Sequence, residues 1–207
     1  MIISMCKILC ITNRKLCKGD FPARIAAIAA QQPAGIILRE KDLPEPEYAA
    51  LAEQIMKICS THGVPCILHS FPQTAAALHA DFLHLPLPVL RGLPDAARTA
   101  LPAFGVSCHA VGDAQEAAAA GASYLIAGHI FATDCKKGLP GRGLAFLHDV
   151  CSSVTLPVYA IGGISPDNAG AVMQQGAAGI CVMSGLMQCD DPADYINRLK
   201  GGMYRAV

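Results

Sequence analysis

Residues 157–183 read PVYAIGGISPDNAGAVMQQGAAGICVM, and this stretch has the pattern of a strand, a helix and a second strand. Two short apolar runs, Pro157–Ala160 and Gly179–Met183, enclose a helical window over Asp167–Gln175. Gly176 follows the window, where the end of a helix favours a residue that adopts the left-handed conformation. The order of these elements predicts two parallel strands joined by a right-handed crossover.

The same unit recurs along the chain. Ala119-Ala120-Gly121-Ala122 precedes one apolar run in the way that Gln174-Gln175-Gly176-Ala177 precedes another. Further helical windows cover Phe21–Gln31, Glu45–Thr61 and Asp113–Ala120. The eight expected strands are Lys7–Thr12, Gly35–Arg39, Pro65–His69, Phe82–Leu85, Phe104–Cys108, Tyr124–Ala127, Pro157–Ala160 and Gly179–Met183. Eight such units predict an α/β fold, a closed (β/α)8 or TIM barrel, with residues 1–207 forming a single domain.

The main alternative fold is an open, doubly wound sheet. In that fold a G-x-G-x-x-G turn follows the first strand, whereas the glycine-rich segments of this chain come late. Apolar residues make up 53% of the 207 residues and charged residues only 15%, which suits parallel strands covered on both faces. We therefore expect the barrel.

Charge and composition exclude several classes of partner. The charges of sixteen basic and sixteen acidic side chains cancel, and the basic residues form no block. We therefore expect a small molecule as the partner, and neither nucleic acid nor a membrane surface. The chain has no apolar run of about 20 residues and no signal-peptide pattern at its start, which predicts a cytoplasmic protein. Ten cysteines occur without a C-x-x-C pair, and Cys66 and His69 are expected on opposite faces of a strand, so no metal site is expected.

Active sites of such barrels lie at the carboxyl ends of the strands, and two glycine-containing turns follow the last two strands. Gly162 and Gly163 follow the seventh strand. Met183 ends the eighth strand, and Ser184 and Gly185 follow it. Their backbone N–H groups are expected to form a cup for a phosphate group. The alternative is that these glycines only make tight turns.

Two charged or titratable residues end other strands. His129 follows the sixth strand, where an imidazole suits proton transfer at neutral pH, although it could instead be a packed histidine bonded to a carbonyl. Arg39 ends the second strand and is expected to bind a substrate anion, the alternative being a salt bridge with Glu40 or Asp42. Lys41 lies further along the loop and is expected to turn outward.

The other histidines are less informative. His69 and His109 follow strand runs and could line the pocket. His84 lies inside a strand and could point into the barrel or away from it. The remaining three are expected on the surface, at His62, His79 and His148.

Four motifs together resemble the thiamin phosphate synthase/TenI superfamily over nearly the whole chain. The most specific segment runs from Gly128 to Gly143 and is similar to the corresponding segment of TenI proteins. The motifs are Leu38-Arg39-Glu40-Lys41, Gly105-Val106-Ser107-x-His109, Gly128-His129-Ile130-Phe131-x-Thr133-x-x-Lys136 and Ala160-Ile161-Gly162-Gly163-Ile164.

The sequence departs from the synthase pattern at the metal site. A synthase of this superfamily has an Asn-Asp pair after the third strand and an Asp after the fourth, which hold the magnesium of the pyrimidine pyrophosphate. Here those places are occupied by His69-Ser70 and by Leu85-Pro86-Leu87-Pro88, and Ile37 replaces the synthase's glutamine. A hard magnesium ion would lack its oxygen ligands.

The resemblance to TenI implies an isomerase, a thiazole tautomerase that aromatises the dihydrothiazole carboxylate phosphate without a metal or other cofactor. It implies His129 as the catalytic acid and base and Arg39 as the carboxylate ligand. It also implies a possible homodimer. The substrate-binding residues expected from the motifs are Arg39, Ser107, Thr133, Lys136, Gly162, Gly163, Met183, Ser184 and Gly185.

Two other functions stay open. One is a divergent thiamin phosphate synthase that recruits other ligands, and the other is a non-catalytic regulator that binds a phosphorylated thiazole. The sequence also leaves open whether His69, His109 or Cys135 assists the chemistry.

Overall fold

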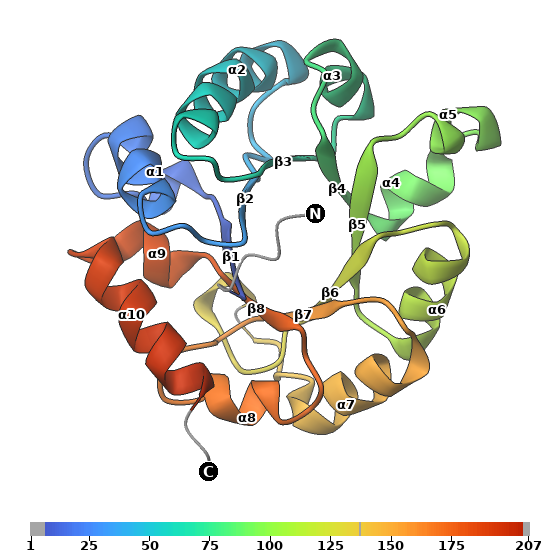
Figure 1. Cartoon of the computed structure of the whole chain (residues 1–207). Helices are drawn as coiled ribbons and strands as arrows, with labels where there is room; N and C mark the ends of the chain where they lie inside the picture. The colour runs from blue at the N-terminus through green and yellow to red at the C-terminus, as the bar shows by residue number, and fades with distance from the viewer. Residues whose placement is uncertain (1–6, 137, 205–207) are drawn as a thin grey trace.

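Eight parallel strands form a closed barrel in the computed structural model, which describes residues 7–136 and 138–204. Each strand pairs with the next along the chain, and the last pairs with the first (Figure 1). The strands are β1 (Ile8–Ile11), β2 (Gly35–Leu38), β3 (Cys66–His69), β4 (Phe82–Pro86), β5 (Ala103–Cys108), β6 (Tyr124–Gly128), β7 (Val158–Ile161) and β8 (Gly179–Val182). The prediction of a TIM barrel is confirmed.

Helices surround the strands on the outside of the barrel (Figure 1). The α-helices are α1 (Phe21–Ala29), α2 (Glu45–Thr61), α3 (Pro72–Ala77), α4 (Leu87–Gly92), α5 (Asp95–Thr99), α6 (Val111–Ala119), α7 (Gly143–Ser153), α8 (Ala169–Met173), α9 (Ser184–Gln188) and α10 (Pro192–Met203). Two 3-10 helices lie in loops, η1 (Arg14–Leu16) and η2 (Asp134–Lys136). No described helix is both long enough and apolar enough to cross a bilayer.

Alternate side chains of each strand face opposite sides, and both sides are buried. On β1, Ile8 and Cys10 pack in the main core against the helices, whereas Leu9 and Ile11 belong to a second cluster inside the barrel. Ile37 of β2 belongs to the inner cluster as well. This alternation explains why the strands read as nearly continuous apolar runs.

The predicted strands agree with the observed ones to within one residue at each end. β2 ends at Leu38 rather than at Arg39, because the Arg39 N–H donates to Oγ1 of Thr12 at 2.9 Å instead of to a neighbouring strand. Gly121 and Gly176 have φ values of 89° and 88°, as expected for glycines that end helices.

Three of the four helical windows need correction. The prediction for α2 is confirmed at both ends. The windows at α1 and α8 were too long, since these helices end at Ala29 and Met173, and α6 begins two residues earlier than expected, at Val111. Such shifts are ordinary at helix ends, where local hydrogen bonds decide the last residue.

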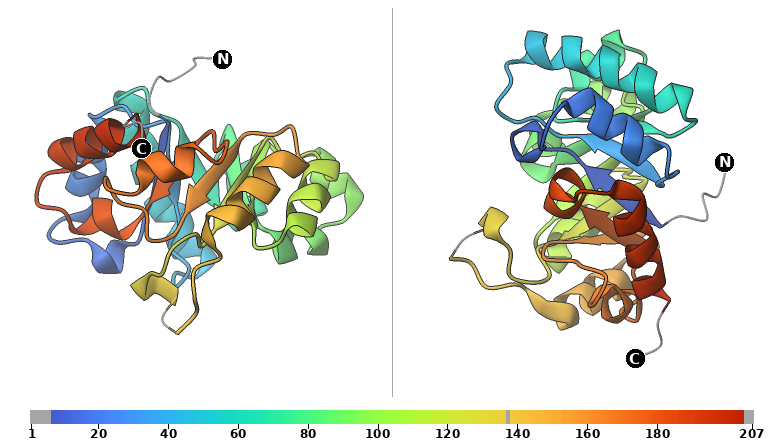
Figure 2. Two further views of the ribbon diagram at one scale, coloured as in Figure 1. Left: turned by 90° about the horizontal axis from the view of Figure 1, so that it is seen from below. Right: turned by 90° about the vertical axis from the view of Figure 1, so that its left-hand side faces the viewer.

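The loop between β6 and α7 projects from the carboxyl-terminal side of the barrel and carries η2 (Figure 2). Backbone hydrogen bonds hold its two ends together, with the N–H of Arg142 donating to His129 and that of Gly143 donating to Ile130, both at 2.9 Å. The loop therefore stands on a fixed base beside the end of β6.

Candidate active site

One cavity of about 500 Å³ opens at the carboxyl ends of the strands. Its lining includes every residue that the sequence predicted for the site: His129, Arg39, Ser107, Thr133, Lys136, Gly162, Gly163, Met183, Ser184 and Gly185. The structure thus brings together residues that are widely separated in the sequence.

The alternation of the strands explains this convergence. Ile37 faces the barrel interior, so Arg39, two residues later, enters the cavity at the mouth. The same relation links Ile67 to His69 on β3, and Ile126 at the inner face of β6 to Gly128. The cavity is the part of the barrel interior at the carboxyl ends of the strands, where polar residues replace aliphatic ones.

The glycines after β7 lie where no side chain fits. Gly162 and Gly163 have φ values of 105° and 64°, a region that L residues rarely adopt. A Cβ on Gly162 would collide with His129, and one on Gly163 would collide with the Ala132 carbonyl oxygen. The two glycines therefore allow the β6 and β7 loops to pack closely beneath the cavity.

Four backbone N–H groups at this side of the cavity are available to a ligand. Those of Gly162, Gly163, Ser184 and Gly185 donate to no other described residue. Such groups are the usual partners of a phosphate at the end of a barrel. Free donors of this kind are compatible with the predicted phosphate cup, which stays a prediction.

Arg39, which follows β2, also lines the cavity and is half-buried. Its guanidinium forms no hydrogen bond or ion pair within residues 7–136 and 138–204. The salt bridge to Glu40 or Asp42 that stood as the alternative is wrong, because both carboxylates pair with Arg14, at 3.2 and 2.7 Å. Burial lowers the pKa of Arg39, and the Glu40 charge opposes that shift. A buried cation without a partner favours an anionic ligand.

Lys41 is exposed, as expected, and it also borders the cavity. Burial lowers its pKa, and the charges of Arg39 and Lys136 lower it further. The turn after β2 bends back over the mouth, where Thr12 and Glu40 hold it to the β1 loop. Three cations from two loops thus share one side of the cavity.

His129 lies at the cavity wall with 8% of its surface exposed. Its Nε2 atom lies 3.4 Å from the Leu139 carbonyl oxygen, a contact long enough to be weak. The nearby His109 is held more firmly, since its Nδ1–H donates to the Gly128 carbonyl at 2.8 Å. In the neutral ring this bond leaves Nε2 of His109 as the hydrogen-bond acceptor.

His69 and His84 line the inner part of the cavity and stack with ring centroids 5.7 Å apart. His84 bonds Ser107 at 2.8 Å and Tyr124 at 3.1 Å, and Nδ1 of His69 bonds Ser70 at 2.6 Å. Burial lowers the pKa of His84 to about 3 and that of His69 well below its usual value. Both imidazoles are therefore neutral at physiological pH.

The direction of His84 could not be decided from the sequence, and here it points inward. The available signal was its spacing of two residues from Phe82, which packs with the inner cluster. The expected surface histidines lie away from the cavity, with His79 and His148 exposed and His62 half-buried. Cys135 also lines the cavity and is exposed.

The neutral His84 predicts loss of stability in acid. Its pKa is about 3 when folded but close to 6.5 when unfolded, so below pH 6.5 the unfolded chain binds a proton that the folded chain does not. The contribution of the neutral His84 to the free energy of unfolding is therefore largest at pH values above 6.5. It is about 2 kcal/mol smaller at pH 5 than at pH 7. Urea unfolding at both pH values should show a smaller loss in His84→Asn than in the wild type.

The matched control is His148→Asn, which changes an exposed histidine and should leave the pH dependence as it is. Equal losses in the wild type and in His84→Asn would mean that His84 takes up a proton in the folded state.

The donor set does not fit a magnesium ion. No Asp or Glu occurs among the described residues that line the cavity, and no group of three metal-binding side chains was found within the described part of the chain. Magnesium prefers carboxylate and water oxygens, whereas this cavity offers imidazoles and cations. Glu40 lies beside the mouth, but both its oxygen atoms already accept hydrogen bonds from Thr12 and Arg14.

Comparison with known proteins shows the family to which the chain is related. The model of the family described as thiamine monophosphate synthase (TMP-TENI) matches residues 8–186. A thiamine-phosphate synthase of Moorella thermoacetica is 37% identical over 178 residues, covering 83% of this chain and 82% of that protein. One of Roseiflexus castenholzii is 37% identical over 163 residues, covering 76% and 70%.

Solved structures show the same architecture. A thiamine phosphate pyrophosphorylase from Pyrococcus furiosus superimposes with a TM-score of 0.82 at 28% identity, covering 95% of each chain. A 3-hexulose-6-phosphate synthase has a TM-score of 0.71 at 17% identity, covering 95% of this chain and 99% of that one, which shows the fold alone.

Proposed function

Because the chain belongs to the thiamine monophosphate synthase (TMP-TENI) family, we propose that it is an enzyme of thiamine biosynthesis, and specifically a thiazole tautomerase. One observation carries the choice of activity. The described lining of one cavity includes His129, backbone N–H groups without a described partner and the unpaired Arg39, and it has no carboxylate. This set suits a dianionic substrate that is rearranged by proton transfer.

The proposed substrate is the dihydrothiazole carboxylate phosphate. Its phosphate is bound by the N–H groups of Gly162, Gly163, Ser184 and Gly185, with Met183 as the residue that turns β8 into α9. Its carboxylate pairs with Arg39 in the bidentate geometry that a guanidinium favours. The two anchors hold the ring across the cavity mouth, beside His129.

In the proposed reaction, the imidazole of His129 takes the proton from ring C2. The electrons of the broken C–H bond form a ring double bond, and the exocyclic double bond accepts a proton at its outer carbon. The same imidazole returns that proton, so that no atom is gained or lost and the ring becomes aromatic. General acid and base catalysis of this kind contributes roughly 10²–10⁴-fold to the rate.

Three further residues complete the proposed site. Lys136 adds a cation near Lys41, Ser107 presents its hydroxyl next to His84, and Thr133 directly precedes η2. We expect Lys136 to favour the dianion, and Ser107 and Thr133 to contact the ring or its substituents.

A second candidate is a divergent thiamine-phosphate synthase, and the names of the relatives favour it over the tautomerase. The donor set described above opposes it, because a magnesium pyrophosphate would meet no carboxylate in this cavity.

One experiment separates the two activities. Purified protein is incubated with the dihydrothiazole phosphate in heavy water, and in parallel with the pyrimidine pyrophosphate, thiazole phosphate and Mg²⁺. Aromatisation in the first mixture supports the tautomerase, and the deuterium at the exocyclic carbon measures how far the imidazole proton exchanges with solvent before it is returned. Condensation in the second mixture without aromatisation in the first would overturn it.

Removal of divalent metal ions should leave the tautomerase rate unchanged within experimental error. The described lining lacks the oxygen ligands that a magnesium ion needs, so we expect no difference after treatment with a chelator. The rate is compared before treatment, after it, and after Mg²⁺ is added back. A loss that Mg²⁺ restores would contradict the proposed chemistry.

A further inference from the structure

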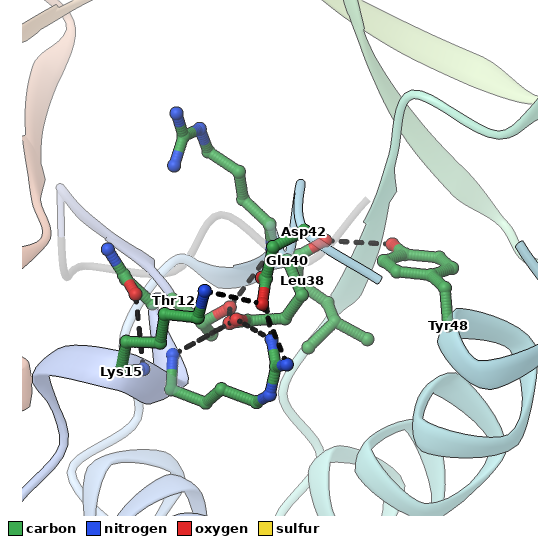
Figure 3. Close-up of polar contacts among 9 residues, drawn as sticks. Thr12, Lys15, Leu38, Glu40, Asp42 and Tyr48 are labelled. Atoms are coloured by element: carbon green, nitrogen blue, oxygen red, sulfur yellow. Dashed lines mark hydrogen bonds and ion pairs between the residues drawn. The ribbon is translucent and has the colours of Figure 1, made fainter. Parts of the chain in front are cut away.

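Two buried residues, Thr12 and Glu40, hold the backbone of Arg39 without contacting its guanidinium. We propose that Thr12 and Glu40 are positioning residues, which fix the backbone at Arg39 so that its side chain meets the substrate's carboxylate. The inference rests on the proposed function for the identity of that anion. Figure 3 shows the contacts among these loops.

Glu40 is buried, with 2% of its surface exposed, and its carboxylate is saturated with donors. It accepts from Thr12 Oγ1 at 2.6 Å, from the Arg14 backbone N–H at 3.0 and 3.1 Å, and from the Arg14 guanidinium at 3.2 Å. A buried carboxylate requires such partners. Its charge is therefore balanced by Arg14, and it does not draw the guanidinium of Arg39 away from the cavity.

Thr12 joins this carboxylate to Arg39. A carboxylate can only accept, so the hydroxyl proton of Thr12 must point at Glu40. The lone pairs of the same oxygen then face the Arg39 N–H, which donates to it at 2.9 Å. Glu40 thus fixes the direction of the Thr12 hydroxyl, and Thr12 fixes the peptide that carries the Arg39 side chain.

The other side of this turn is held from α2. The Tyr48 hydroxyl donates to the Leu38 carbonyl at 2.7 Å and accepts from the His69 N–H at 2.8 Å. Both polar groups of the peptide that joins Leu38 to Arg39, the Leu38 carbonyl and the Arg39 N–H, therefore have fixed partners before the Arg39 side chain enters the cavity (Figure 3). A long side chain on a rigid base loses less entropy when it binds an anion.

The test compares Thr12→Val, which removes the hydroxyl at nearly constant shape, with Thr12→Ser, which keeps it. Binding of the stable aromatic thiazole carboxylate phosphate is measured by calorimetry. We expect Thr12→Val to weaken binding by roughly tenfold, about the effect of one buried hydrogen bond, and Thr12→Ser to restore most of it. Equal affinities in the wild type and in Thr12→Val would overturn the proposal.

A double-mutant cycle separates positioning from general damage. In an Arg39→Ala background, Thr12→Val should cost little more binding, because the side chain that it positions is absent. Fully additive losses would mean that Thr12 stabilises the fold without acting through Arg39.

Glu40→Gln and Asp42→Asn form a matched pair, since both remove a charge that contacts Arg14. Asp42 is more exposed and has no link to Thr12, so Asp42→Asn should bind as the wild type does, whereas Glu40→Gln should resemble Thr12→Val. Equal effects of both changes would show that only the Arg14 ion pairs matter.

A further measurement does not depend on the ligand. The NMR order parameter of the Arg39 Nε–H group should fall in Thr12→Val and recover in Thr12→Ser. An unchanged order parameter overturns the positioning role whatever the substrate is. If instead no variant and no wild type aromatises the dihydrothiazole, but the order parameter falls as expected, the proposed function fails and the positioning role stands.

Discussion

Replacing Arg39 by alanine is expected to lower kcat/KM for the dihydrothiazole carboxylate phosphate by about 2–4 kcal/mol, or roughly 30- to 1000-fold. The guanidinium is half-buried and has no partner among the described residues, so a bound carboxylate would supply its first ion pair. The loss should appear chiefly in KM, because the carboxylate keeps its charge throughout the reaction. Steady-state kinetics in the wild type and the variant measure both constants.

The control for this prediction is Arg198→Ala. Arg198 lies on the exposed side of α10, where it pairs with Asp194 at 2.8 Å, and its loss should leave both constants unchanged. A thiazole phosphate without the carboxylate provides a second control, since it should bind the wild type and Arg39→Ala equally. If KM and kcat for the full substrate are the same in both proteins, Arg39 does not bind the anion.

The fold and the lining of the cavity were largely predictable from the sequence. The strands are covered on both faces, so their apolar runs are distinct, and their ends locate the mouth. Because the side chains of a strand alternate between its two faces, the sequence also predicts which residues after each strand enter the cavity. Arg39, two residues after the inward-facing Ile37, is an example. The chemical roles of these residues stay predictions, because placement at a cavity does not establish a role.

Contacts between loops were not predictable in the same way. Glu40 pairs with Arg14, which is 26 residues away in the sequence and becomes its neighbour only when β1 and β2 pair. That Lys41 borders the cavity although it is exposed could not be predicted either, because the shape of the turn after β2 depends on such contacts. The contact of His84 with Ser107 depends on the pairing of β4 with β5, in which His84 lies opposite Gly105 and the Ser107 hydroxyl comes within 2.8 Å of its ring.

His129→Asn is expected to lower kcat by roughly 10²–10⁴-fold while substrate binding persists. Asparagine keeps part of the size and hydrogen bonding of histidine but has no group that can take a proton from carbon. The proposed anchors, Arg39 and the backbone N–H groups around Gly162, are untouched by the change. Single-turnover rates in heavy water measure the chemical step, and calorimetry with the aromatic product measures binding.

The comparison requires that the variant folds, which circular dichroism and the unfolding midpoint can establish. His148→Asn is the matched control, because this exposed histidine on α7 should leave the rate as it is. The same experiment tests the regulator alternative. If the protein is a regulator, the wild type and His129→Asn would both bind the thiazole carboxylate phosphate, and neither would aromatise the dihydrothiazole.

A folded His129→Asn variant with a near wild-type rate would make His129 a structural residue and move the search to the other imidazoles. His69 is a poor base, because burial lowers its pKa well below the usual value and its Nδ1 is engaged by Ser70. His109 is the better candidate, since its Nδ1–H is held by the Gly128 carbonyl and leaves Nε2 as the acceptor. In that case His109→Asn would show the loss predicted for His129→Asn, and aromatisation of the substrate would be lost with it.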